Sequence, residues 1–243
     1  MATSRDGWEA VPKGIVDLHT HTFRSDGELC PAELAQRARL NGYSVLGLAD
    51  HADHSNLEAV LDSAVKAAKS LRGAYPGFRV VPGVEITHVP PPLIPGLIRR
   101  ARELGALCVV VHGESPVEPV EPGTNLAAIS GRCDILAHPG PIGEREALLA
   151  AKNGVALELS ARGGHSLANG AVAKAALATG CPMVISSDAH APGDILSPAL
   201  WRMVARGAGL GVADARKLAA FAARLAKRLS ASSAVPRERG GIP

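Results

Sequence analysis

The sequence predicts a single-domain α/β protein folded as a distorted (β/α)7 barrel. Seven short runs rich in Val, Ile and Leu alternate with longer stretches whose apolar residues recur every three to four positions. The short runs are apolar along nearly their whole length, which is typical of parallel strands covered by helices. A doubly wound open sheet is the rival arrangement.

The order of the elements follows from these runs. The predicted strands are Gly14–Thr22, Val45–His51, Phe78–Thr87, Leu107–Gly113, Asp134–Pro139, Val155–Ser160 and Pro182–His190. The predicted helices are Pro31–Asn41, Leu57–Arg72, Pro95–Leu104, Asn125–Ile129, Glu144–Asn153, Ala168–Thr179 and Val212–Leu229. Several of these helices are followed directly by Gly, a common helix-ending residue.

Composition bounds the class of protein. Of 243 residues, 47% are hydrophobic and 20% charged, which suits one domain over residues 13–232, with loose segments at 1–12 and 233–243. No apolar run reaches the roughly 18–20 residues of a membrane span, and the first residues lack the apolar core of a secretion signal. The four cysteines form no CxxC pair, as expected for reduced thiols in a cytoplasmic protein. A net charge of +3 is too small to imply a polyanionic partner.

Polar residues gather where the predicted strands end. Six of the nine histidines lie at or within two residues of such an end: His19, His21, His51, His112, His138 and His190. Glu85 and Asp188 lie at strand ends too. Because the carboxyl ends of barrel strands converge on one face, we expect these eight side chains to meet there.

A metal centre explains this set best. A single histidine at a strand end is more often a hydrogen-bonded structural residue than a ligand, but eight such positions together favour ligation. Imidazole with carboxylate suits Zn, Mn or Fe. Eight ligands exceed the needs of one ion, so two or three divalent ions are expected, with Glu85 as the bridging carboxylate.

The motifs DLHTHTxxSDG, LGLADH, PGVEIT, VVVHGE, AHPG and SSDAH follow one another between Asp17 and Ala191. In this order they resemble the polymerase-and-histidinol-phosphatase (PHP) family of metal-dependent phosphoesterases. The resemblance implies a distorted (β/α)7 barrel with two or three metal ions. It implies metal ligands at His19, His21, Asp26, His51, Glu85, His112, His138, Asp188 and His190. Asp26 rests on the resemblance most heavily, because an Asp before Gly27 is common in turns.

Other polar residues have supporting roles in this hypothesis. Asp17 and Asp50 are expected to orient imidazoles. Arg162 and His165, in a Gly-rich loop after the sixth strand, are candidate catalytic residues: Arg162 to hold phosphate, His165 to contact it or act as an acid. His54 and His88 are interpreted as loop histidines, although His88 could line the substrate mouth.

The expected function is hydrolysis of a small phosphomonoester, as by a histidinol-phosphate phosphatase, with a metal-bound hydroxide as nucleophile. The alternative is a nucleotide or oligoribonucleotide phosphoesterase or 5′–3′ exonuclease, favoured less because only 3% of residues are aromatic. A metal-dependent amidohydrolase and a non-catalytic PHP module are weaker hypotheses. We expect a small phosphorylated substrate and no membrane partner; the sequence carries no indication of oligomeric state.

Overall fold

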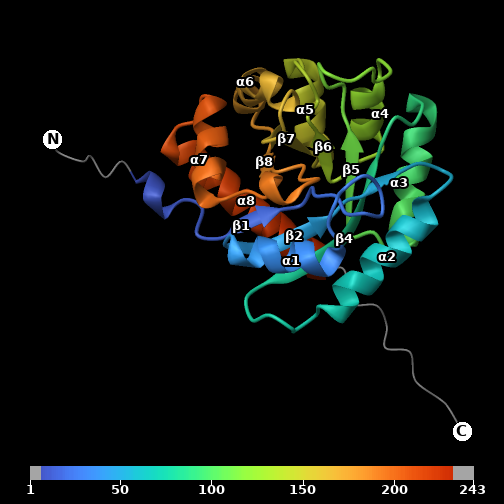
Figure 1. The fold of residues 1–243 in the computed structure, drawn as a ribbon. Helices are drawn as coiled ribbons and strands as arrows, with labels where there is room; N and C mark the ends of the chain where they lie inside the picture. Colours follow the sequence, from blue (N-terminus) through green and yellow to red (C-terminus); the bar gives the residue numbers. More distant parts are fainter. Residues whose placement is uncertain (1–6, 232–243) are drawn as a thin grey trace, which may run out of the picture.

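Parallel strands form the centre of the protein, shown here as a computed structural model that describes residues 7–231 (Figure 1). The strands are β1 (Ile15–Asp17), β2 (Tyr43–Leu48), β3 (His51–Ala52), β4 (Arg79–Ile86), β5 (Cys108–His112), β6 (Ile135–Ala137), β7 (Ala156–Ser160) and β8 (Met183–Ser186). They pair in the order β1-β2-β4-β5-β6-β7-β8, and the short β3 extends the pairing with β4. The result is a nearly closed barrel of seven main strands, as the sequence predicts.

The barrel closes only near the carboxyl ends of its first and last strands. A parallel bridge joins Thr20 to Ala189 beyond the ends of β1 and β8. The His21 N–H donates to the Ala189 carbonyl at 2.9 Å, and the Asp188 N–H donates to the His19 carbonyl at 3.0 Å. The predicted rival, an open sheet, is therefore wrong. The closing bonds lie among the predicted metal ligands, so closure and site assembly are coupled.

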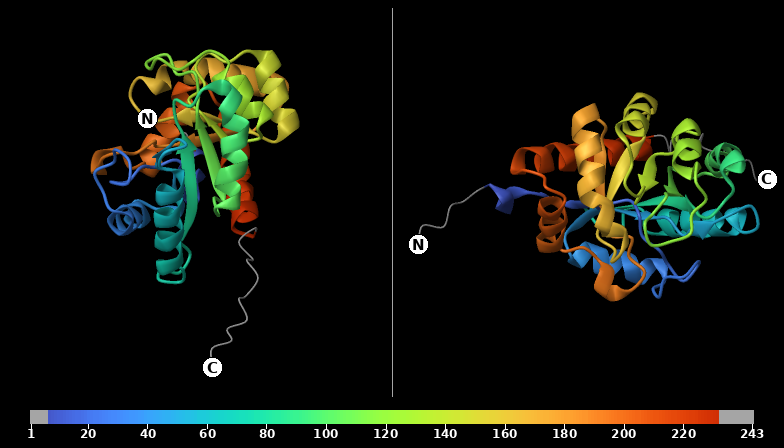
Figure 2. Two further views of the ribbon diagram at one scale, coloured as in Figure 1. Left: turned by 90° about the vertical axis from the view of Figure 1, so that its right-hand side faces the viewer. Right: turned by 90° about the horizontal axis from the view of Figure 1, so that it is seen from above.

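Helices surround the strands in the views of Figures 1 and 2. They are α1 (Pro31–Leu40), α2 (Leu57–Ser70), α3 (Ile94–Glu103), α4 (Thr124–Ser130), α5 (Glu144–Asn153), α6 (Asn169–Thr179), α7 (Pro198–Gly207) and α8 (Val212–Ala231). Four 3₁₀ turns complete the described chain: η1 (Trp8–Ala10), η2 (Pro91–Leu93), η3 (His165–Ala168) and η4 (Pro192–Asp194). Helix α7 is absent from the prediction, whereas the other seven helices lie within a few residues of their predicted positions.

Two apolar clusters hold this architecture together. The outer cluster packs the helices against the outward faces of the strands. The inner cluster fills the barrel with small and branched side chains such as Val45, Val81, Val110 and Ile135. Residues of α8, including Leu225, belong to the inner cluster, so the last helix packs against the barrel interior. Burial on both faces explains why the strands are almost uniformly apolar.

The chain ends differ in part from the expected loose segments. Trp8 and Val11 are buried in the outer cluster, and the Val11 N–H donates to the Trp8 carbonyl at 3.0 Å. Residues 7–12 are therefore packed against the domain. The remaining predicted loose residues, 1–6 and 233–243, lie outside the described part of the chain. Among residues 7–231, no helix combines the length and apolar character needed to cross a bilayer.

Candidate metal centre

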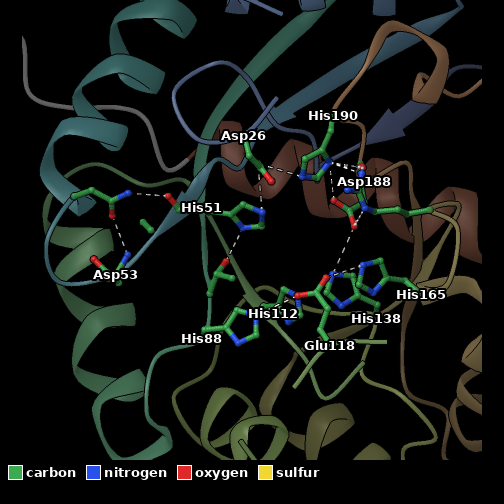
Figure 3. Close-up of a pocket in the computed structure, with 14 residues that line it drawn as sticks. Asp26, His51, Asp53, His88, His112, Glu118, His138, His165, Asp188 and His190 are labelled. Atoms are coloured by element: carbon green, nitrogen blue, oxygen red, sulfur yellow. Dashed lines mark hydrogen bonds and ion pairs between the residues drawn. The ribbon is translucent and has the colours of Figure 1, made fainter. Parts of the chain in front are cut away.

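The structure brings all nine predicted ligands to the carboxyl end of the barrel. Figure 3 shows those that line the cavity: Asp26, His51, His112, His138, Asp188 and His190. The nitrogen and oxygen atoms of the nine ligands form overlapping groups in which every atom lies within 4.8 Å of the others. Three such groups are His19, His21 and Asp188; Glu85, His112 and His138; and His21, Asp26, His51 and His190. The cavity beside them has a volume of about 350 Å³.

Glu85, at the end of β4, occupies the centre of the arrangement and is fully buried. Its Oε1 lies 3.3 Å from His19 Nε2 and 3.5 Å from His138 Nε2. Its Oε2 faces another pair, 2.7 Å from His51 Nδ1 and 3.7 Å from His21 Nε2. Each oxygen of one carboxylate thus serves a different pair of imidazoles, which is the placement that a bridging ligand needs.

Asp188, just past the end of β8, approaches the same histidines from the other side. Its Oδ1 lies 3.1 Å from His21 Nε2 and 3.7 Å from His19 Nε2. Its Oδ2 lies 3.7 Å from His138 Nε2. Because residues 19 and 21 of an extended chain point to the same face, one carboxylate contacts both imidazoles.

Asp26 reaches the cluster from the turn that follows β1. Its Oδ1 lies 3.2 Å from His190 Nε2, 3.5 Å from His51 Nε2 and 3.9 Å from His21 Nδ1. These histidines come from three separate strand ends. The aspartate, which turn chemistry alone would also explain, therefore faces the same group of imidazoles as the family resemblance implies.

Burial leaves several ligand atoms without partners. Within residues 7–231, His19 Nε2, both ring nitrogens of His21, Glu85 Oε1 and His138 Nδ1 are buried and make no hydrogen bond. Unsatisfied buried polar atoms are costly and rare in proteins. Their concentration at one point, from imidazoles and carboxylates, fits divalent Zn, Mn or Fe.

The electrostatics agree with this fit. Burial alone would raise the pKa of Glu85, but the charges of His19 and His51 hold it well below its usual range. Burial lowers the pKa of His21 to about 4, which keeps this imidazole neutral and its lone pair available. Burial would also lower the pKa of His51, yet the charges of Glu85 and Asp26 raise it to about 10. Without a metal ion, protonated imidazoles balance the negative charge of the buried carboxylates. A bound divalent cation would supply this positive charge in their place.

Glu158, in the middle of β7, orients the imidazole of His19. It is not among the site residues predicted from the sequence. It is fully buried; its Oε1 lies 2.8 Å from His19 Nδ1, and its Oε2 accepts the His138 backbone N–H at 3.0 Å. A carboxylate on Nδ1 fixes the tautomer and turns Nε2 toward the ligand cluster. A charged residue inside the apolar run VALELS was the available indication.

The expected roles of Asp17 and Asp50 need correction, because neither carboxylate contacts an imidazole ring. Asp17 accepts hydrogen bonds from the His19 backbone N–H and the Tyr43 hydroxyl. Asp50 instead accepts from Thr22 and Ser25 in the turn that carries Asp26. Both aspartates hold backbone segments. Ring orientation comes instead from Glu158, from Thr87 Oγ1 2.7 Å from His51 Nδ1, and from the Gly113 carbonyl 3.0 Å from His112 Nδ1.

The two candidate catalytic residues line the cavity. Arg162 Nη1 lies 2.7 Å from His190 Nδ1, and Arg162 is partly exposed beside Asp188. His165 stacks on His138 with ring centroids 4.1 Å apart, and its Nδ1 lies 2.6 Å from Ser115 Oγ. Burial and the charge of His138 lower the pKa of His165 to about 4. His165 is therefore neutral at pH 7 in this arrangement.

The two histidines interpreted as loop residues differ in their position relative to the cavity. His54 is exposed and does not line the cavity. His88 does line it, and its Nε2 lies 3.1 Å from Glu118 Oε2 (Figure 3). The sequence does not identify Glu118 as a site residue, because a glutamate in the Pro-rich loop VEPVEPGT gives no indication of chemistry.

Comparison with other proteins places the chain in a family. It matches no model of a known protein family. It is, however, 44% identical over 195 residues to the uncharacterized protein MJ1295 of Methanocaldococcus jannaschii, and the match covers 80% of this chain and 89% of the archaeal protein. The chain belongs to the same family as that protein.

More distant relatives have named activities. The chain is 26% identical over 210 residues to the DNA polymerase/3′-5′ exonuclease PolX of Bacillus subtilis, and spans 37% of the length of that protein. It is 42% identical over 71 residues, 29% of its length, to a 5′-3′ exoribonuclease of Haemophilus influenzae, of which the match covers 23%.

A solved structure shares the fold. One chain in the structure of an archaeal ribonuclease P with mature tRNA aligns with a TM-score of 0.67 at 18% identity, covering 93% of this chain and 96% of that one. At this identity the likeness concerns the fold alone.

Proposed function

We propose that this chain is a metal-dependent phosphoesterase of the PHP type that acts on nucleotides or nucleic acids. The observation that carries the proposal is the buried cluster of imidazoles and carboxylates with partnerless ligand atoms beside a cavity. The PHP resemblance of the ordered motifs and the names of the two distant relatives agree with phosphoester chemistry.

The substrate class follows from the relatives and from the cavity. Both distant relatives are named as exonucleases, so the nucleotide or exonuclease alternative takes precedence over a histidinol-phosphate-like substrate. The fourteen residues that line the cavity include no Phe, Tyr or Trp. The imidazole, carboxylate and guanidinium groups of this lining suit metal ions and phosphate oxygens, so we propose hydrolysis with little dependence on base sequence.

The metal-binding residues in this proposal are the nine that the resemblance implies, in the three groups described above. Divalent ions would supply Lewis-acid polarisation of the phosphoryl group and activation of water. Glu158 and Thr87 hold imidazoles in place through Nδ1, and the barrel wall excludes bulk water from Glu85 and His19.

Arg162 and His165 supply the protein's own contacts to phosphate. The side chain of Arg162 is 34% exposed at the cavity wall, where the planar fork of its guanidinium can hold phosphoryl oxygens. His165 lies with Nδ1 2.6 Å from Ser115 Oγ and with Nε2 3.3 Å from Glu118 Oε1 at the cavity mouth. A neutral imidazole has one N–H donor and one acceptor nitrogen. His165 therefore serves as a neutral donor to a phosphoryl oxygen.

The experiment is a substrate panel with added Mn. It contains short 5′-phosphorylated RNA and DNA oligonucleotides, nucleoside phosphates, small phosphomonoesters including histidinol phosphate, and amides. We expect release of nucleotide or phosphate from nucleic acids or nucleotides. Hydrolysis of amides alone, or of small phosphomonoesters but no nucleotide, would contradict the proposal.

Variants of Arg162 test whether this activity depends on a residue of the cavity wall. Arg162→Ala should raise KM roughly ten- to a hundredfold, the effect of losing hydrogen bonds to a charged group. Arg162→Lys should restore part of the affinity, because it keeps the charge without the fork. The control is Arg145→Ala, which removes an exposed cation on α5. An unchanged KM in Arg162→Ala would remove Arg162 from the proposal.

A further inference from the structure

Glu118 brings a carboxylate to the cavity mouth on the loop of residues 114–123. Three imidazoles surround it, all through Nε2: His88 in the loop after β4, His112 at the end of β5 and His165 at the start of η3 (Figure 3). His88 and His112 lie 3.1 Å from Oε2, and His165 lies 3.3 Å from Oε1. The ligand atoms of His88, His112 and Glu118 all lie within 4.8 Å of one another.

This spacing matches that of the main cluster. His21 Nε2 and Asp188 Oδ1 are 3.1 Å apart, and His19 Nε2 and Glu85 Oε1 are 3.3 Å apart. Nitrogen and oxygen ligands placed about 2.0–2.2 Å from one tetrahedral ion are separated by roughly 3.3–3.5 Å. The outer group therefore has nearly the ligand spacing of the inner one.

Backbone strain marks His88 independently. Four residues other than glycine have positive φ in the described chain: His88, Arg132, His138 and Asp188. Arg132 follows α4 and lies outside the cavity lining, whereas the other three line the cavity. His138 and Asp188 are predicted ligands. Strained backbone persists where the surroundings fix it, commonly at functional sites, and His88 shares this property with φ at 52°.

We propose that His88, His112 and Glu118 bind a divalent transition-metal ion at the mouth of the cavity. Imidazole and carboxylate ligands suit Zn, Mn or Fe. His112 offers one nitrogen, Nε2, to an ion, because its Nδ1 lies 3.0 Å from the Gly113 carbonyl. In this proposal Nε2 binds the outer ion, and Glu85 and His138 are left to the inner ions. The ion thus binds His112 from the barrel and Glu118 from the loop. When it is bound, Glu118 holds residues 114–123 at the mouth of the cavity.

This site rests on the proposed phosphoesterase centre, from which it takes His112, but its test does not require enzymatic activity. Full-length protein is stripped of metal, reloaded with Zn or Mn and desalted, and its metal content is measured. We expect Glu118→Gln and His88→Ala each to hold about one ion fewer per chain than the unmodified protein, because each removes one of three ligands. Zn should also slow hydrogen–deuterium exchange of residues 114–123 in the unmodified protein and not in Glu118→Gln.

The control is Glu121→Gln, which changes an exposed glutamate of the same loop and should leave both measurements unchanged. An unaltered metal content in Glu118→Gln and His88→Ala would show that Glu118 is only a hydrogen-bonding contact, and would overturn the proposal. Loss of every ion would overturn it too, because the groups around Asp188 and Asp26 remain intact. If the unmodified protein binds no ion, both the outer site and the proposed phosphoesterase centre fail. If it binds ions and the two variants bind equally many, only the outer site fails, so the two failures are distinguishable.

Discussion

Replacing Glu85 by Gln is expected to lower phosphoester hydrolysis about a thousandfold or more, since metal ions at such sites contribute several kcal/mol to transition-state stabilisation. Glutamine keeps the shape of the side chain but offers one oxygen, whereas Glu85 presents one oxygen to His19 and His138 and the other to His51 and His21. An amide also places a donor among imidazoles. The substitution should therefore remove at least one ion, and metal content and hydrolysis should fall together.

The matched control for this change is Glu103→Gln, which alters an exposed carboxylate on α3 that pairs with Arg100 at 3.4 Å. It should keep full activity and metal content. Thermal unfolding of the metal-free proteins checks that Glu85→Gln still folds. A folded Glu85→Gln protein with its full complement of ions would refute the bridging role.

The second large effect is expected from Glu158→Gln. This carboxylate lies 2.8 Å from His19 Nδ1 and accepts the His138 backbone N–H, and its oxygen lies within 4.8 Å of ring nitrogens of both histidines. Losing such a partner typically costs ten- to a hundredfold in metal affinity or activity. Titration against a competing chelator should show weaker binding, and excess metal should restore most of the hydrolysis. The restored activity separates an orienting role from a ligand role.

Glu146→Gln, on the first turn of α5, is a suitable control for the loss of one negative charge. Chelator competition curves that coincide for Glu158→Gln and the unmodified protein would contradict the orienting role. So would a loss of activity that no metal concentration restores.

The sequence predicted the barrel, and it predicted that the nine candidate ligands converge at one end of it, because both follow from local patterns. Apolar strands ending in histidine or carboxylate place those residues on one face, whichever helices intervene. Asp26 shows where local reasoning stops: its sequence context fits any turn, and only the fold shows that His51 and His190 face it.

Other features depend on long-range contacts that a single sequence does not reveal. Glu158 contacts His19 across 139 positions of the chain. Glu118 meets His88 across 30 positions, from a loop whose composition indicates only a turn. The positions of Asp17 and Asp50 next to predicted ligands in the sequence indicate contacts with imidazoles, yet their hydrogen bonds go to backbone N–H groups, to hydroxyl groups and to the turn near Asp26.

The central claim is that the converging imidazoles and carboxylates bind metal. The most direct measurement is the metal content per chain of the full-length protein, purified anaerobically with Mn, Fe and Zn supplied. We predict about two to three ions per chain, since eight or nine ligands exceed the four to six that one ion takes. A content below one ion per chain would contradict the account.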